Sequence, residues 1–234
     1  MSSSKQILLV AATSLETTYL RSVLGMKETH QGRWHYTQPS ADVYLLHTGI
    51  GMVNTAFALG QYLAKHPVDF AINFGIAGSF DKEMELGSVV EVIEDSFSEL
   101  GAESPAGFID LEKMGFPLLV TPTHTYFNKM SNPNIQAEEI PQVRGITVNR
   151  VHGIEAHAQA IQAEWNCQVE SMEGAAFFYA MLSSGVPFHA YRGISNYVEN
   201  RNKANWNIPL AAKNVQSFVA RKLQHILERL PNSY

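Results

Sequence analysis

Short apolar runs alternate with segments of helical periodicity along most of this chain. A run of this kind, bounded by turn-forming residues, is typical of a strand that is buried on both faces. We expect strands at residues 6–12, 42–47, 68–73, 89–93, 145–151 and 186–194, and helices at residues 15–24, 52–64, 154–165, 204–230 and after residue 173. The alternation predicts an α/β fold with a mixed, largely parallel central sheet, helices on both of its faces and right-handed crossovers.

Composition favours one domain spanning residues 1–234. With 45% hydrophobic and 17% charged residues, the chain can bury one large core. Its net charge of −5 gives no basic footprint for nucleic acid. The lone Cys167 excludes an internal disulfide and a cysteine zinc site, which fits a reducing cytoplasm. No apolar run reaches the roughly 20 residues that span a bilayer, and residues 1–5 are too short and polar for a signal peptide. We expect a soluble cytoplasmic protein.

Two segments lack clear periodicity. Residues 95–117 are rich in Gly, Pro, Ser and Glu, and we expect a long surface excursion there; residues 121–142 are again irregular, with at most a short helix. Aromatic residues in such segments often mark an interface between subunits. These aromatic residues are Phe108, Phe116, Tyr126 and Phe127. Pro231 is expected to stop the terminal helix.

Glu173 is the first candidate for a functional residue. It stands at the mouth of a predicted buried helix that continues as an Ala-rich, aromatic run. Because burying an unpaired carboxylate is costly, Glu173 needs a partner, and an ionised Glu can hold the vicinal hydroxyls of a ligand. The alternative is an acid that is favoured only by the helix dipole. The predicted strand at 186–194 ends in Ser195 and Asn196, and ligands of open α/β sheets bind outside the carboxyl ends of strands. Glu173 and Asn196 are therefore expected at one rim.

The glycine motifs do not indicate a nucleotide cofactor. Gly49 and Gly51 follow a predicted strand, but the third glycine of a dinucleotide fingerprint is replaced by Asn54, and a P-loop sequence does not occur. Gly75 and Gly78 follow another strand, where two glycines let a ligand lie directly on the backbone. We expect no cofactor.

The histidines give no metal motif. His152 and His157 stand five residues apart without a zinc-binding arrangement around them, and His157 fits a surface or packing role. No metal is expected.

Five short motifs in this order resemble the nucleoside phosphorylase and nucleosidase superfamily, and within it the futalosine hydrolases more than the methylthioadenosine/adenosylhomocysteine nucleosidases. The motifs are AATSLE at residues 11–16, TGIG at 48–51, NFGIAG at 73–78, ESMEGAA at 170–176 and ISNYVE at 194–199, with Arg201 and Trp206 after them. The five motifs in this order are specific together, and the resemblance covers nearly the whole chain.

The resemblance implies cleavage of an N-ribosyl bond through a cationic, oxocarbenium-like sugar. It implies that Glu173 grips the ribose 2′- and 3′-hydroxyls with Met172 packed on the sugar, that Glu16 deprotonates the attacking water, and that Asn196 faces the purine. The backbone around the base and nucleophile would come from Gly75, Ile76, Ala77, Gly78, Val151 and His152.

Asn196 departs from the adenine-specific nucleosidases, which by resemblance carry Asp at this position. An amide cannot act as an acid at ordinary pH, but it can donate to O6 of a 6-oxopurine and accept from N7–H. We therefore expect a preference for hypoxanthine, the base of futalosine. An amide can also pair with adenine, and Asn196 could instead only cap a turn.

Water is favoured over phosphate as the nucleophile. Phosphorolysis needs cationic donors, and the segments around Glu16 and Gly75 contain no Lys or Arg. The sequence commits neither Arg192 nor Arg201 to a role: Arg192 can pair with a carboxylate inside the fold, and Arg201 can reach the benzoate carboxylate of futalosine if that part of the substrate lies over residues 200–205. The alternatives are an adenine nucleosidase, a purine nucleoside phosphorylase and a nucleoside-binding protein without turnover. The resemblance suggests a homodimer or a higher homo-oligomer.

Overall fold

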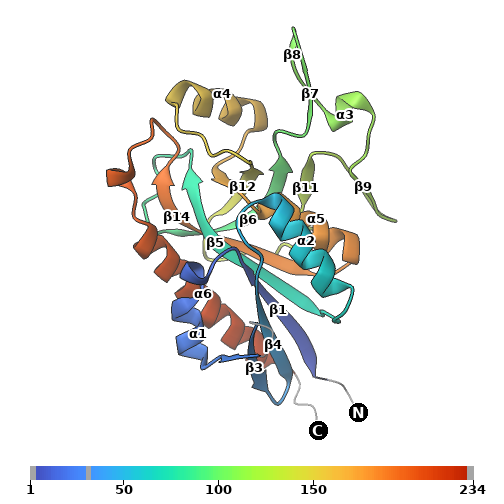
Figure 1. Ribbon diagram of the computed structural model, residues 1–234, viewed down its shortest axis with the longest axis vertical. Helices are drawn as coiled ribbons and strands as arrows, with labels where there is room; N and C mark the ends of the chain where they lie inside the picture. The colour runs from blue at the N-terminus through green and yellow to red at the C-terminus, as the bar shows by residue number, and fades with distance from the viewer. Residues whose placement is uncertain (1–3, 30–32, 231–234) are drawn as a thin grey trace.

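The computed structural model describes residues 4–29 and 33–230, and these form a mixed sheet between two layers of helices (Figure 1). In this part of the chain the sheet has ten strands in the order β11-β6-β12-β13-β5-β1-β4-β3-β2, with β14 pairing with β5 and β6. Its strands are β1 (Lys5–Ala11), β2 (Lys27–Glu28), β3 (Trp34–Gln38), β4 (Ala41–His47), β5 (Phe70–Ser79), β6 (Val89–Phe97), β11 (Lys129–Ser131), β12 (Gln142–Thr147), β13 (Val169–Ser171) and β14 (Phe188–Tyr197).

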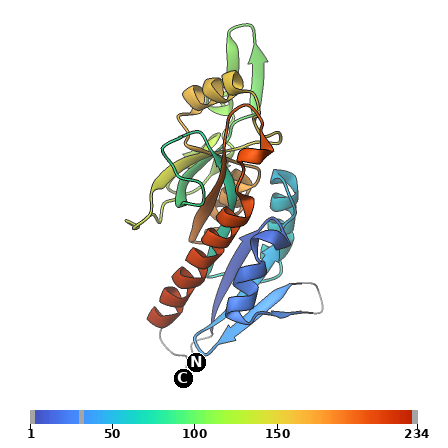
Figure 2. The same ribbon diagram turned by 90° about the vertical axis from the view of Figure 1, so that its left-hand side faces the viewer.

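The helices cover both faces of this sheet, as expected. They are α1 (Thr18–Leu24), α2 (Met52–Leu63), α3 (Leu111–Met114), α4 (Glu155–Trp165), α5 (Gly174–Ser184) and α6 (Ile208–Arg229), with 3-10 turns η1 (Ser14–Glu16) and η2 (Lys203–Asn205). Helices α2 and α5 pack together, and α6 packs with α1 (Figure 2). Alternate residues of β1 face the two layers: Leu8 packs in the core with α5, and Leu9 in the core with α6. Burial on both faces explains the continuous apolar run of this strand.

The sheet is mixed, as expected, but it contains more antiparallel strand pairs than a largely parallel sheet would have. Strands β1, β4, β5 and β14 pair in parallel, whereas β13 runs antiparallel to β5 and β14 antiparallel to β6. Strands β2 and β3, and then β3 and β4, also pair antiparallel. Short connections close such pairs, whereas a parallel pair needs a longer crossover.

Strand β5 is longer than the expected strand at residues 68–73. The glycine segment from Gly75 to Gly78, which we expected to be a loop, is the second half of β5 and pairs with β14 on one side. Strand β14 likewise includes Asn196, which was expected beyond the strand end. Pairing with strands distant in the sequence overrides the local preference of glycine for loops.

The two segments expected to be irregular contain small β-structures. A hairpin of β7 (Gly101–Ser104) and β8 (Gly107–Asp110) projects at the top of Figure 1 and leads into α3. Strands β9 (Leu119–Val120) and β10 (Thr125–Tyr126) form a second pair, and the described residues between 121 and 142 contain no helix. Pro231 lies outside the described residues. None of the helices in the described part of the chain is long and apolar enough to cross a membrane.

Candidate active site

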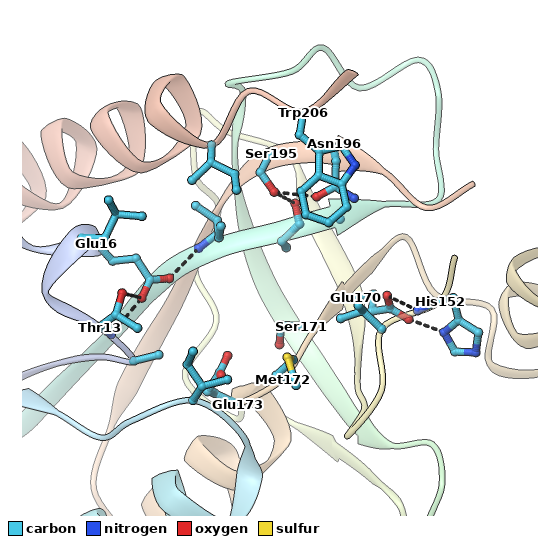
Figure 3. Close-up of a pocket in the computed structure, with 18 of the residues that line it drawn as sticks. Thr13, Glu16, His152, Glu170, Ser171, Met172, Glu173, Ser195, Asn196 and Trp206 are labelled. Carbon is cyan, nitrogen blue, oxygen red and sulfur yellow. Dashed lines mark hydrogen bonds and ion pairs between the residues drawn. The ribbon is translucent and has the colours of Figure 1, made fainter. Parts of the chain in front are cut away.

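A cavity of about 370 Å³ lies at the ends of β1, β5, β13 and β14 (Figure 3). Glu16, Glu173 and Asn196 approach it from three sides, although most of the sequence separates the first two. The residues that line the cavity are Ala12, Thr13, Leu15, Glu16, Ile50, Ile76, Ala77, Gly78, Val151, His152, Glu170, Ser171, Met172, Glu173, Ser195, Asn196, Arg201, Trp206 and Ile208.

Glu16 is held in one orientation by three hydrogen bonds. It lies in η1 directly after β1 and is 7% exposed. Its Oε2 accepts from the backbone N and the Oγ1 of Thr13, each at 3.0 Å, and its Oε1 accepts from Ile76 N at 3.2 Å. Both oxygens of the carboxylate therefore have a donor. Glu16 is thus a fixed hydrogen-bond acceptor at the cavity wall.

Gly75 leaves the space that Glu16 occupies. A Cβ at position 75 would stand 2.7 Å from Glu16 Oε1, closer than two such atoms approach without a shift. Gly75 does not line the cavity, whereas its neighbours Ile76, Ala77 and Gly78 do. The glycine therefore serves the carboxylate and does not form part of the cavity wall, contrary to the expectation that all four residues would line the ligand.

Glu173 stands immediately before α5, where a helix N-terminus favours negative charge. Its Oε1 accepts from Gly51 N at 2.8 Å. Gly51 has φ +94°, a conformation that L side chains rarely adopt, so a glycine aims this N–H at the carboxylate. The TGIG motif thus holds an acid of the cavity, which agrees with the absence of a dinucleotide fingerprint.

A buried cation, Arg192, affects the pKa of Glu173. Burial raises the pKa of the Glu173 carboxyl, and Glu16 raises it further, while the Gly51 hydrogen bond and Arg192 lower it. Arg192 is 2% exposed, and its guanidinium donates to Asn73 Oδ1 at 2.6 Å and to Tyr191 O at 2.9 Å. Among the described residues its guanidinium forms no direct ion pair with a carboxylate, in contrast to the pairing that the sequence suggested, so its charge acts on the carboxylates through space.

Asn196 is oriented by its neighbours on β14. Its Oδ1 accepts from Ser195 Oγ at 2.7 Å, and its Nδ2 donates to Tyr197 O at 3.1 Å. One N–H of the amide and one lone pair on its oxygen remain for a ligand. Asn196 does not cap a turn, because it lies within a strand.

A buried pair of a carboxylate and a histidine lies in the same wall. Glu170, on β13, is 4% exposed, and its Oε1 accepts from His152 N at 3.0 Å while its Oε2 contacts His152 Nδ1. Burial raises the pKa of Glu170, whereas the His152 contacts lower it. The sequence placed His152 here, but it gave Glu170 no role. The signal that the sequence offered for Glu170 was its place as a single acid in a buried strand.

Arg201 and Trp206 form the polar end of the lining. The Arg201 guanidinium stacks over the Trp206 ring at 4.7 Å, and the Arg201 backbone N donates to Gly153 O at 3.1 Å. Among the described residues no acidic side chain pairs with Arg201. Arg201 is also the only Lys or Arg among the described residues that line the cavity.

Most of the predicted site residues therefore meet in one cavity. Met172 and Val151 also line it, so Gly75 is the only predicted residue outside it. The sequence missed the supporting role of Thr13 and Gly51, because a backbone or side-chain donor to a distant carboxylate leaves no pattern in the chain. It also missed Leu15, Ile50 and Ile208, which are ordinary apolar residues in the sequence.

One group of metal-type ligands lies elsewhere in the described part of the chain. Ligand atoms of Glu91, Glu138 and His189 lie within 4.8 Å of one another, outside the cavity. His189 Nδ1 contacts Glu91, and Lys222 Nζ contacts Glu138. Each carboxylate therefore already has a partner.

Known proteins resemble this chain in sequence and in fold. A model of the phosphorylase superfamily matches residues 6–230. The futalosine hydrolase of Thermus thermophilus is 34% identical over 200 residues, which cover 83% of this chain and 84% of that protein. The futalosine hydrolase of Acidothermus cellulolyticus is 29% identical over 216 residues, covering 91% and 88%.

Solved structures agree at the level of the fold. The futalosine hydrolase of Helicobacter pylori superposes with a TM-score of 0.77 at 15% identity, covering 94% of this chain and 98% of that one. A 5′-methylthioadenosine/S-adenosylhomocysteine nucleosidase of Colwellia psychrerythraea, in complex with adenine, gives a TM-score of 0.76 at 21% identity, covering 99% and 98%. From the family model and the sequence relatives together, the chain belongs to the phosphorylase superfamily and, within it, to the futalosine hydrolases.

Proposed function

We propose that this protein hydrolyses the N-ribosidic bond of futalosine and releases hypoxanthine and dehypoxanthine futalosine. The observation that carries the proposal is the meeting of Glu16, Glu173 and Asn196 in one cavity. The sequence relatives support futalosine as the substrate. The reaction would belong to menaquinone biosynthesis. A cytoplasmic location goes with this, because the buried Cys167 is a free thiol.

In this proposal the two glutamates act on the sugar. Glu173 accepts hydrogen bonds from the ribose 2′- and 3′-hydroxyls, and its negative charge stabilises the developing oxocarbenium ion. Glu16, fixed by Thr13 and Ile76, accepts a proton from the attacking water as general base. Met172 packs against the sugar. The neutral purine leaves with a proton at N7 that comes from solvent.

Asn196 reads the purine in this proposal. Its Nδ2 has a second N–H, beyond the one that Tyr197 O accepts, for donation to O6. Its Oδ1 keeps a lone pair, beyond the one that Ser195 uses, for N7–H. A carboxylate at this position would repel O6. The amide therefore favours a hypoxanthine base.

Water is the proposed nucleophile. A phosphate dianion needs cationic donors, and Arg201 is the single Lys or Arg among the described lining residues. Arg192 is 2% exposed, does not line the cavity and donates to Asn73 and Tyr191. Both Glu16 and Glu173 would repel the dianion. These charges support hydrolysis over phosphorolysis.

Release of free base from a set of nucleosides tests the proposal. The protein is incubated with futalosine, methylthioadenosine and inosine, each with and without phosphate. We expect hypoxanthine from futalosine at a rate that phosphate does not change. Faster release from methylthioadenosine would indicate an adenine nucleosidase, and dependence on phosphate a phosphorylase. No base from any of them would indicate a binding protein.

Arg201 is the proposed partner of the substrate carboxylate. It lacks an acidic partner among the described residues and lines the cavity beside Trp206. We expect Arg201→Ala to raise KM for futalosine by about 10-fold or more, the loss of a charge-assisted hydrogen bond, and to leave cleavage of inosine unchanged. Lys203→Ala, a neighbouring exposed cation outside the cavity, is the control. An equal effect of R201A on both substrates would contradict this role.

We also propose that the protein is a homodimer. The exposed apolar side chains Val53 and Phe57 lie one turn apart on α2, beside an apolar hollow. The residues that line this hollow are Met52, Val53, Ala56, Phe97, Leu100, Leu118, Ala176 and Tyr179. Ile50, which is 57% exposed, lines the cavity and lies three residues before Val53 in the chain. A second copy of the chain would cover both the exposed side chains of α2 and Ile50 at the cavity.

A further inference from the structure

The end of β14 opposite to Asn196 carries a second group of ligand-type side chains. One ring nitrogen of His189, the second residue of this strand, and one carboxylate oxygen each of Glu91 and Glu138 lie within 4.8 Å of one another. None of the three lines the proposed active-site cavity, so the reaction proposed above gives them no role. They come from β6, from β14 and from the connection between β11 and β12. Residues so far apart in the chain form no metal motif in the sequence.

Hydrogen bonds orient the two carboxylates of this cluster. Glu91 is fully buried; its Oε1 contacts His189 Nδ1, and its Oε2 accepts from Gln142 Nε2 at 2.8 Å. Lys222 Nζ contacts Oε1 of Glu138. Each carboxylate oxygen has more than one lone pair, so both acids can still bind a cation. Partners of this kind, which orient a ligand from behind, usually surround a bound metal ion.

A buried hydroxyl beside the cluster has no partner. Tyr191 is 0% exposed, and its OH makes no hydrogen bond with the described residues. Tyr191 stands opposite Glu91 across the pair of β14 and β6, and its ring stacks at 5.7 Å on the ring of His189. Burial raises the pKa of Tyr191, and the charges of Glu91 and Glu138 raise it further, because both carboxylates lie near the hydroxyl. A buried hydroxyl without a partner is costly, so this one favours a ligand next to the cluster.

Two ionised carboxylates and a neutral imidazole match a zinc ion in charge and in ligand type. Zn²⁺ binds His nitrogen and Glu oxygen at about 2.0–2.2 Å, often with three protein ligands and one water. We propose that Glu91, Glu138 and His189 bind one Zn²⁺ ion, and that a water completes the tetrahedron and donates to the Tyr191 hydroxyl. The two carboxylates neutralise the ion, so no net charge is buried. Mg²⁺ and Ca²⁺ prefer oxygen ligands alone, which disfavours them at a site with an imidazole.

The cluster needs only a small closure to hold the ion. Ligands at the corners of a tetrahedral zinc site are about 3.4 Å apart, because each lies about 2.1 Å from the metal. The atoms that lie within 4.8 Å of one another must therefore approach by about 1–1.5 Å at most. Rotation of the Glu138 and His189 side chains, which are only partly buried, can supply this movement.

The cluster can also be reached from solvent. Glu138 and His189 line a cavity of about 600 Å³ that lies against α6 and has room for the fourth ligand. Lys222 lines the same cavity and competes with a metal ion for Glu138. Arg221 and Arg229 also line it, but both are exposed, and solvent screens their charges. Lys222 is therefore the cation that most opposes zinc binding here.

Zinc binding to the whole protein, freed of metal with a chelator, tests the site. We expect calorimetry with Zn²⁺ alone to show one ion per chain with a Kd of about 1 µM or below. Glu138→Gln replaces a charged ligand, and we expect it to weaken binding by about 100-fold or more. His225→Ala is the matched control, because His225 lines the same cavity without belonging to the cluster, and it should leave the Kd unchanged.

Two further variants separate a zinc site from a set of ion pairs that binds no metal. Lys222→Met removes the competing cation, so we expect it to tighten zinc binding by about 3- to 10-fold. Tyr191→Phe keeps the ring and removes only the hydroxyl, and we expect about 10-fold weaker binding. An excess of Zn²⁺ of about 100 times the Kd should raise the Tm of the wild-type protein by about 5 °C or more, and should not raise that of E138Q.

Four results would overturn the zinc site. They are no binding of Zn²⁺ by the wild-type protein at about 100 µM, a Kd that E138Q leaves unchanged, tighter binding of Mg²⁺ than of Zn²⁺, and an anomalous X-ray peak for zinc away from the three ligands in a soaked crystal. The first, third and fourth results use the unaltered protein, so they do not depend on the folding of a variant. None of these measurements involves hydrolysis of futalosine, so the zinc site and the proposed function stand or fall separately.

Discussion

Glu16 is a carboxylate whose surroundings admit no exchange for an amide. Thr13 N and Ile76 N donate to different oxygens of the side chain, so in Glu16→Gln the NH₂ group faces a donor in either orientation. We expect this variant to lose about 100- to 10,000-fold in the rate of futalosine hydrolysis, the usual worth of a general base. Hypoxanthine release measures the rate, and circular dichroism confirms that the variant is folded. Activity within tenfold of wild type would remove Glu16 from the role of base.

Gly75 is expected to matter through Glu16 alone. In Gly75→Ala the new Cβ would stand 2.7 Å from Glu16 Oε1, so the carboxylate must move from its three donors. We expect turnover to fall about 10-fold or more. Gly60→Ala is the matched control, because this glycine lies in the interior of α2 with open space around it. That change should raise stability by about 0.5–1 kcal/mol and leave turnover unchanged.

The prediction for Gly75 can fail in a definite way. If G75A hydrolyses futalosine as fast as the wild-type protein, the position of the Glu16 carboxylate does not limit the reaction.

At the scale of elements, α5 begins over a buried acid. Asp95 of β6 lies beneath Gly174, where a Cβ would meet Asp95 Oδ2 at 1.9 Å, and Thr147 links the two by donating to Asp95 and accepting from Ala175 N. Burial raises the pKa of Asp95 to about 7, against the lowering effect of Thr147, Arg192 and Ser96 N. The start of the helix that carries Glu173 therefore packs on a group that titrates near neutrality.

This pKa sets a direction for stability with pH. Since the folded protein holds the Asp95 proton more tightly than the unfolded chain, whose pKa is near 3.8, this group lowers stability as pH rises from about 4 to about 7. Asp95→Asn stays neutral in both states. We expect its Tm relative to wild type to rise between pH 4.5 and pH 8, as measured by calorimetry at each pH.

The comparison of two proteins at each pH matters here, because burial also raises the pKa of Glu170 and of Glu173. These carboxyls are common to both proteins, so the difference isolates Asp95. A Tm difference that stays constant or falls with rising pH would show that Asp95 is ionised at low cost.

At the scale of the whole molecule, exposed apolar side chains on one surface favour binding of a second copy of the chain. Val53 is 76% exposed and Phe57 66% exposed, and burial of such side chains is the main gain of a stable dimer. By light scattering we expect the wild-type protein to be a dimer and the double variant Val53→Glu and Phe57→Glu to be a monomer. Val23→Glu, an exposed apolar residue on α1, should leave the dimer intact. A monomeric wild-type protein would refute the proposed assembly.

Local pattern in the sequence was sufficient for the framework of this fold. Apolar runs marked the central parts of β1, β4, β5 and β14, because strands buried on both faces must be apolar throughout. Polar residues directly after such runs, as at Glu16 and before α5 at Glu173, marked the rim, because ligands bind at the carboxyl ends of strands. The glycines of β5 misled the prediction, because local preference reads them as a loop.

Only the tertiary structure decided how these residues work together. The cluster of Glu91, Glu138 and His189 depends on the pairing of β6 with β14, and the hydrogen bond from Gly51 to Glu173 joins residues 122 apart in the chain. The sequence by itself determined which segments are buried and which acids stand at their ends, because burial leaves a periodic pattern. Register and long-range hydrogen bonds leave no such pattern, since they depend on which strands become neighbours when the whole core packs.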